Sequence, residues 1–147
     1  MLDLKRSIKI IEFGSADYEK LLAFRFVNLR KPLGLLWTEN DIKLESKQIH
    51  FALYNRKQIV GSCLLKKISN KKVRLRQMAI DSKLQKKNLG SRLLKYAENY
   101  AKSKSYNEII IIARLTAYFF YRKNGFYPVG KIFSDVTVDS IKMIKKI

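Results

Sequence analysis

The sequence has little cysteine, histidine and proline, and each shortage excludes a class of structure. Of its 147 residues, one is cysteine, one is histidine and two are proline. The single thiol, Cys63, cannot form an intramolecular disulfide, which fits a reducing compartment, so we expect a cytoplasmic protein. One cysteine and one histidine are too few for a structural zinc site made from these ligands, and we expect no metal. Because no Pro-rich or Gly/Ser-rich linker interrupts the chain, we expect one domain over residues 1–147.

Long apolar runs are also missing. Uninterrupted apolar stretches such as residues 109–113 are far shorter than the ~20 residues that a membrane-spanning helix needs. No apolar core of a signal peptide follows the first residues, Met1 to Arg6. We therefore expect neither a membrane span nor a secretion signal. Hydrophobic residues still make up 47% of the chain, which is enough for a folded core.

Acidic residues are scarce relative to basic ones. The chain has 12 Asp and Glu against 31 Lys and Arg, a net charge of +19. Such a balance favours an anionic partner: nucleic acid, a membrane surface or a polyphosphate ligand. Residues 66–104 alone hold 13 Lys and Arg with only Asp81 and Glu98, a net charge of +11. The middle of the chain is therefore the predicted anion-facing part.

The hydrophobic periodicity predicts a mixed α/β protein. Strands are expected over residues 7–13, 50–54, 58–67, 73–80, 108–113, 126–130 and 136–144. Helices are expected from the Ser15 cap to about residue 30, from Thr38 onward, and over residues 90–103 and 115–123. Within residues 73–80, Val73 and Leu75 alternate with Arg74 and Arg76, which predicts one solvent-facing side. Residues 78–80 are apolar on both sides, so a bulge near Gln77 is plausible.

The segment Gln85-Lys86-Lys87-Asn88-Leu89-Gly90-Ser91 has features of a phosphate-binding loop. It leads from a predicted strand into a helix, whose first N–H groups lack intrahelical partners and carry the positive end of the dipole. Gly90 leaves room for a close approach, and Lys86 and Lys87 add positive charge. An ordinary turn with a solvated basic helix start explains this short stretch equally well.

With its neighbours, this loop resembles the cofactor-binding motif of the GNAT superfamily of N-acetyltransferases. That motif is a strand followed by Gln/Arg-x-x-Gly-x-Gly/Ala and an amphipathic helix, matched here by Gln85-x-x-Asn88-x-Gly90. Ala117 to Phe126, which reads Ala-Tyr-Phe-Phe-Tyr-Arg-Lys-Asn-Gly-Phe, is similar to a second family motif. The tail Phe133 to Met143 resembles the final strand region of one bacterial subgroup. The resemblance implies a mostly antiparallel mixed sheet flanked by about four helices, and acetyl-CoA as co-substrate.

The resemblance also implies roles for particular residues. The backbone of Met78 and Ile80, with Ala79 between them, would bind the pantetheine arm, and the Met78 N–H would stabilise the oxyanion. Tyr121 matches the family tyrosine that protonates the leaving thiolate, although the aromatic run around it is also typical of a core. The other cofactor-binding positions implied are Gln85, Lys86, Lys87, Asn88, Leu89, Gly90, Ser91, Arg114, Phe120 and Lys123.

Three positions depart from the family pattern. Asn88 replaces the first glycine of the loop motif, although asparagine tolerates a left-handed backbone better than most residues. Arg114 stands where the family often has an asparagine that contacts the cofactor arm. Ser140 stands where the subgroup often has a histidine, so no role of that histidine transfers to this chain.

The sequence leaves other functions open. A basic nucleic-acid-binding protein would use the same charge and the aromatic residues, and a relic would bind coenzyme A without turnover. The acceptor amine is not identified, but a strongly cationic enzyme favours a neutral or anionic acceptor over a polyamine. Residues 73–80 contain no carboxylate to act as general base, and His50 is more typical of a structural histidine. Family members are often dimers, so the resemblance makes a homodimer possible, but the sequence does not indicate the oligomeric state.

Overall fold

A single β-sheet organises the molecule in the computed structural model, which describes residues 5–85, 87–135 and 138–147. Within these residues, seven strands are ordered β1-β2-β3-β4-β5-β7-β6. All neighbours are antiparallel except β4 and β5. The strands are β1 (Arg6–Ile11), β2 (Ile49–Asn55), β3 (Gln58–Lys67), β4 (Lys72–Ile80), β5 (Glu108–Arg114), β6 (Tyr127–Asp135) and β7 (Val138–Lys146). The prediction of a mixed, mostly antiparallel sheet is confirmed.

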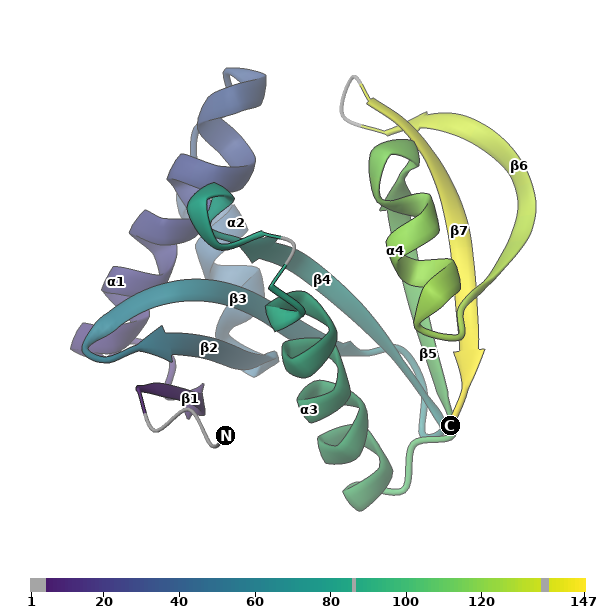
Figure 1. Cartoon of the computed structure of the whole chain (residues 1–147), viewed down its shortest axis with the longest axis horizontal. Helices are drawn as coiled ribbons and strands as arrows, with labels where there is room; N and C mark the ends of the chain where they lie inside the picture. The colour runs from purple at the N-terminus through teal and green to yellow at the C-terminus, as the bar shows by residue number, and fades with distance from the viewer. Residues whose placement is uncertain (1–4, 86, 136–137) are drawn as a thin grey trace.

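Four α-helices are present in the described ranges and cover both faces of the sheet (Figure 1). They are α1 (Ala16–Arg25), α2 (Glu39–Leu44), α3 (Leu89–Ser103) and α4 (Tyr118–Lys123). One buried cluster joins α3 and α4 to the sheet through residues such as Leu93 and Tyr121. A second cluster joins α1 to β2 through Leu21 and Ala52 on the opposite face.

The predicted elements are recovered, with differences at the ends of helices. The strand predicted over residues 58–67 has the same bounds as β3. The predicted cap at Thr38 is also present, and it forms a full capping box with Asp41. The helix that begins after Ser15 is α-helical only to Arg25 and continues as a π-helical turn, η1 (Phe26–Arg30), and a short 3-10 turn, η2 (Lys31–Leu33). Local hydrogen bonding accounts for part of this change, because the Asn28 side-chain amide donates to the Phe24 carbonyl at 2.9 Å.

At the C-terminal end of the chain, two expectations were inaccurate. The segment predicted as a helix over residues 115–123 begins with a 3-10 turn, η5 (Leu115–Ala117), before α4. Strand β6 extends to Asp135, five residues past the predicted end at Gly130. Gly130 adopts φ +84°, and the register with β7 shifts between Val129 and Phe133. The glycine therefore lies at an irregularity within the strand rather than at its end.

Strands β4 and β5 separate along their length. They pair only where Lys72, Val73 and Arg74 lie opposite residues 108–110. Beyond this point they diverge, and Figure 1 shows them meeting near the C-terminus and moving apart toward the other end. The sheet thus opens between its fourth and fifth strands, and the backbone of the later part of β4 has no β5 partner in the described register.

Candidate active site

A bulge in β4 lies at the opening between the two strands. Gln77 has φ +55°, a left-handed conformation for a residue that is not glycine. The register with β3 shifts between Ser62 and Leu64, and the Ser62 hydroxyl donates to the Gln77 carbonyl at 2.9 Å. The plausible bulge near Gln77 is thus confirmed.

The bulge keeps the apolar side chains of β4 on one face. Val73 and Leu75 pack in the α3 cluster before it, and Met78 and Ile80 pack against the same cluster after it. Without the extra residue, strict alternation would turn Met78 and Ile80 to the other face. The backbone is therefore irregular where the resemblance places the reacting thioester.

A cavity of about 970 Å³ occupies the opening between β4 and β5. Residues of η1, η2, β4, β5 and α4 contribute to its wall. Six of the residues proposed from the sequence line it: Met78, Ala79, Ile80, Gln85, Arg114 and Tyr121. They come from separate segments between residues 78 and 121, and the cavity that they share opens where β4 and β5 diverge.

Tyr121 lies on α4 with its side chain buried against the cavity. Its exposed fraction is 7%, and its ring packs against the rings of Phe120 and Phe126 at centroid distances of 5.0 and 5.6 Å. Burial raises the pKa of the Tyr121 phenol above its ordinary value of 10, and Cys63 also raises it, while Arg114 lowers it. The phenol is therefore protonated at neutral pH and able to donate a proton. The Tyr121 side chain is therefore part of the hydrophobic core and also part of the cavity wall.

The loop before α3 contains a residue in the left-handed conformation. Asn88 has φ 64° and ψ 13° and precedes the helix without capping it through its side chain. The expectation that asparagine keeps the left-handed conformation of the missing glycine is confirmed. The Leu89 side chain is buried in the core, which leaves only its backbone to face a ligand.

Gly90 lies in the first turn of α3, where a side chain has no room. A Cβ atom there would lie 3.1 Å from Cε1 and Cζ of Phe120. Phe120 does not line the cavity but packs beside this turn. Ser91 is half-buried in the same turn, and Lys87 is exposed before it. Lys86, also proposed as a binding residue, lies outside the described residues.

Comparison with known proteins agrees with this geometry. Residues 37–147 match the family model described as the acetyltransferase (GNAT) domain. The chain belongs to the GNAT acetyltransferase family. The resemblance inferred from Gln85 to Gly90 and Ala117 to Phe126 is thus confirmed.

Solved structures share the fold of this GNAT domain. A structure from Lactobacillus plantarum assigned as an N-acetyltransferase has a TM-score of 0.84 and 20% identity, covering 95% of this chain and 98% of that one. An acetyltransferase from Streptococcus agalactiae has a TM-score of 0.79 and 20% identity over 99% and 100% of the two chains. A GNAT family acetyltransferase from Elizabethkingia anophelis, solved with acetyl-CoA bound, has a TM-score of 0.75 and 16% identity over 99% and 100%.

Some candidate residues of the GNAT domain lie away from the cavity. Lys123 is exposed on α4 and does not line it. His50 is buried, with Nε2 3.0 Å from the Glu45 carbonyl oxygen, and burial lowers its pKa. Burial raises the pKa of the Cys63 thiol, as expected of an unreactive core residue. Among the described lining residues, none is a carboxylate or a histidine, so no general base is identified there.

The basic side of the cavity could not be predicted from the sequence. Arg74 and Arg76 were predicted to face solvent, but both are half-buried and line the cavity together with Arg30. The reason is tertiary, because η1 packs against β4 and lines the cavity together with these side chains. The alternation of arginine with Val73 and Leu75 was the available signal, but periodicity cannot distinguish a solvated face from a cavity wall.

Neither a metal-ligand cluster nor a membrane-spanning helix occurs in the described residues. Over residues 5–85, 87–135 and 138–147, no group of three or more His, Cys, Asp or Glu side chains is arranged to hold a metal ion. In the same ranges, no helix is both long and apolar enough to span a membrane.

Proposed function

We propose that this GNAT domain is an acetyl-CoA-dependent N-acetyltransferase that transfers the acetyl group directly to an amine. The observation that carries the proposal is the cavity between the diverging strands β4 and β5, with the Met78 backbone on one side and the Tyr121 phenol on the other. A GNAT relative of the same fold was solved with acetyl-CoA bound, which supports this choice of co-substrate.

The residues proposed from the sequence divide into two groups by position. The unpaired edge of β4 at Met78, Ala79 and Ile80 would bind the extended pantetheine arm by strand-like hydrogen bonds. The amides from residue 87 to Ser91 would bind the pyrophosphate at the α3 N-terminus, where the helix dipole favours negative charge. Gly90 would permit the close approach, and Arg114 would add a positive charge beside the arm.

The transfer then needs no covalent enzyme intermediate. A neutral amine nitrogen attacks the thioester carbonyl carbon, and the Met78 N–H stabilises the oxyanion that forms. The carbon–sulfur bond breaks, and the departing thiolate takes the proton of the Tyr121 hydroxyl. The amine loses one proton to solvent as the amide forms, and Tyr121 regains a proton from solvent.

Two measurements test the proposal. Acetyl-CoA and coenzyme A at millimolar concentration should raise the melting temperature, because a ligand that binds only the native state stabilises it by mass action. Thiol release from acetyl-CoA should then depend on an added amine from a panel of amines. A melting shift without thiol release for any amine would indicate a relic that binds coenzyme A. No shift, together with tight and salt-sensitive binding to DNA or RNA, would replace the proposal with a nucleic-acid-binding function.

A further inference from the structure

The charged side chains of the described residues that line the cavity are all positive. Its charged lining residues, among those the structure describes, are all arginines, at positions 30, 74, 76 and 114. No lysine, aspartate or glutamate lines the same wall in the described part of the chain. Arg114 lies on the Tyr121 side, where its charge lowers the pKa of that phenol. Arg30, Arg74 and Arg76 come from η1 and β4 and form a separate group, which we call the arginine wall.

The arginine wall is held in place by neighbouring groups. Arg76 donates to Gln48 Oε1 at 3.0 Å, and Arg30 donates to the Leu36 carbonyl at 3.2 Å. The Arg30 guanidinium also lies 4.1 Å from the centre of the Trp37 ring. These contacts fix the direction of two guanidinium groups before any ligand arrives, which lowers the entropy cost of binding.

Arg74, the third member of the arginine wall, is not held by a hydrogen bond from its Nε atom. Its Nε atom is buried and has no hydrogen-bond partner among the described residues. No carboxylate of the described residues lies within ion-pair distance of Arg74 or Arg76. A buried donor without a partner costs free energy, and a ligand oxygen would remove that cost.

The surroundings of the arginine wall offset only part of its positive charge. Burial lowers the pKa of Arg76 first, and the nearby charges of Arg74, Arg25 and Arg30 lower it further, while Glu45 raises it. The local groups are thus four guanidinium groups and two carboxylates, a net charge of +2: Arg25, Arg30, Arg74, Arg76, Glu45 and Asp41. Like charges held together in a partly buried place are unfavourable unless an anion compensates them.

The wall is distinct from the proposed pyrophosphate site. Val73 and Leu75 pack in the α3 cluster, and Arg74 and Arg76 alternate with them on the other face of β4. The α3 N-terminus therefore lies on one face of the sheet and the arginine wall on the other. An extended arm that ends in the opening between the strands would present its thioester to the wall from the side of α3.

We infer that the amine acceptor carries an oxyanion group, a carboxylate or a phosphate, which the arginine wall binds through Arg74 and Arg76. This inference rests on the proposed function, because it assigns the second substrate of the same cavity. A guanidinium group binds two oxygens of such an anion in a planar, bidentate arrangement. The acceptor is then an amino acid-like or aminophosphate molecule, or a chain end of that chemistry, and dicationic polyamines are excluded by repulsion.

Calorimetric titration tests the inference independently of turnover. The probes are matched pairs that differ in the oxyanion: 4-aminobutyrate with butylamine, and O-phosphoethanolamine with ethanolamine, each with and without coenzyme A. We expect at least one acid probe to bind about 10-fold or more tightly than its partner. The pair that shows the difference identifies the anion as carboxylate or phosphate. Equal binding within both pairs would overturn the inference.

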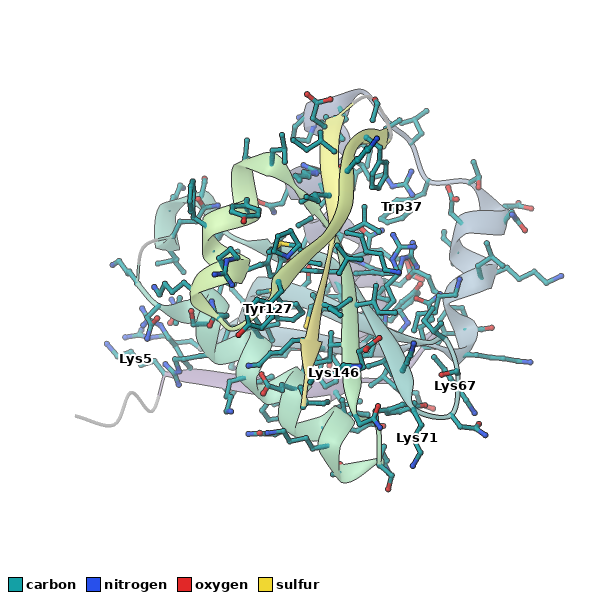
Figure 2. All side chains as sticks on the ribbon, turned by 90° about the vertical axis from the view of Figure 1, so that its right-hand side faces the viewer. Lys5, Trp37, Lys67, Lys71, Tyr127 and Lys146 are labelled. Atoms are coloured by element: carbon teal, nitrogen blue, oxygen red, sulfur yellow. The ribbon has the colours of Figure 1, made fainter. Side chains whose placement is uncertain are left out.

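Variants assign the effect to the wall. Arg74→Gln should weaken binding of the acid probe by about 10- to 100-fold and leave the matched amine unchanged. Arg74→Lys should recover part of the loss, since it restores the charge without the bidentate geometry. Lys67→Gln is the matched control, because Lys67 is an exposed cation outside the cavity. Figure 2 places Lys67 and Lys71 at one end of the molecule, away from Trp37, which stacks on Arg30.

The results separate this inference from the proposed function. Acid-selective binding that Arg74→Gln abolishes supports the arginine wall as an oxyanion site even if thiol release is absent. In that case the transferase proposal fails, and with it the assignment of the bound anion as an acceptor. Thiol release at equal kcat/KM for acids and matched amines supports the transferase and overturns the inference. An equal loss of binding in Arg74→Gln and Lys67→Gln would also overturn it, because the effect would then be one of net charge.

Discussion

Replacement of Tyr121 by phenylalanine removes one hydroxyl from the cavity and little else. The ring contacts with Phe120 and Phe126, at 5.0 and 5.6 Å between centroids, do not involve the oxygen. The side chain is buried, so the phenylalanine ring is expected to occupy the same position. The free energy of unfolding should therefore change by no more than about 1 kcal/mol.

The effect on the reaction should be far larger. A positioned proton donor contributes roughly 10²–10⁴-fold to a rate, which corresponds to about 3–5 kcal/mol of transition-state stabilisation. Because the hydroxyl acts on the leaving sulfur and not in binding, Tyr121→Phe should lower kcat by this factor. The KM for acetyl-CoA should stay within about threefold of the original value.

The pH dependence of the original protein follows from the same geometry. Burial raises the pKa of Tyr121 above 10, and the donor acts only in its protonated form. A raised pKa moves deprotonation to higher pH, so kcat should show no alkaline decline from this group below about pH 10. The assay is thiol release from acetyl-CoA at saturating amine, measured from pH 6 to pH 10.

Tyr118→Phe is the matched control, since Tyr118 lies on the same helix but does not line the cavity. It should keep kcat within about threefold of the original. A kcat for Tyr121→Phe close to that of the control would refute the role as proton donor and leave Tyr121 as a core residue. An alkaline decline of kcat near pH 8 that persists in Tyr121→Phe would point to a different titrating group.

Three other substitutions address the loop and the helix that begins there. Asn88→Val should cost about 1–3 kcal/mol of unfolding free energy, measured by urea denaturation, because a β-branched residue is strained at φ 64°. Gly90→Leu should raise the Kd of acetyl-CoA at least about 10-fold by calorimetry, because its Cβ would already lie 3.1 Å from the Phe120 ring and the longer side chain would displace the first turn of α3. Glu98→Gln should destabilise the fold by about 1–2 kcal/mol in urea, since the buried carboxylate lies 2.9 Å from Lys145 Nζ and that cation is partly exposed.

Each of these has a matched comparison. Asn88→Gly should change stability by less than about 1 kcal/mol, and an equal loss in both Asn88 variants would contradict the strain argument. Gly90→Ala should weaken acetyl-CoA binding less than the leucine variant, in proportion to side-chain size. Glu19→Gln removes an exposed carboxylate from α1 and should leave stability nearly unchanged. A Glu98→Gln variant as stable as this control would show that the ion pairs contribute nothing.

The sequence predicted most of the candidate site because its residues lie in a few local segments. The loop from Gln85 to Ser91 and the run from Ala117 to Phe126 are contiguous, and their residue types indicate a turn, a helix start and an aromatic helix without knowledge of the rest. The left-handed backbone at Asn88 also followed from its residue type. The bulge at Gln77 was visible because the apolar pattern of β4 changes phase there.

The order of residues along the chain could not show which of the candidate site residues line the same cavity. Lys123 matched a motif but lies exposed on α4, whereas Met78 and Tyr121 line the same cavity. Part of the excess charge is structural, since Glu98 is surrounded by Lys95, Lys102 and Lys145 within 3.7 Å. Another part lies on the arginine wall, where the sequence predicted only a solvent-facing side of a strand.

The sequence by itself determined the order and type of the elements and the family, and it pointed to the candidate phosphate-binding loop. These depend on hydrophobic period, capping residues and turn chemistry, which act over a few residues at a time. The tertiary structure alone decided that β4 and β5 diverge after Arg74, that the π turn η1 covers the β4 face, and that the arginine wall lines the same cavity as Tyr121. These features depend on contacts between segments far apart in the chain. The local sequence around an arginine is the same whether its side chain faces water or another element, so the sequence pattern cannot tell the two cases apart.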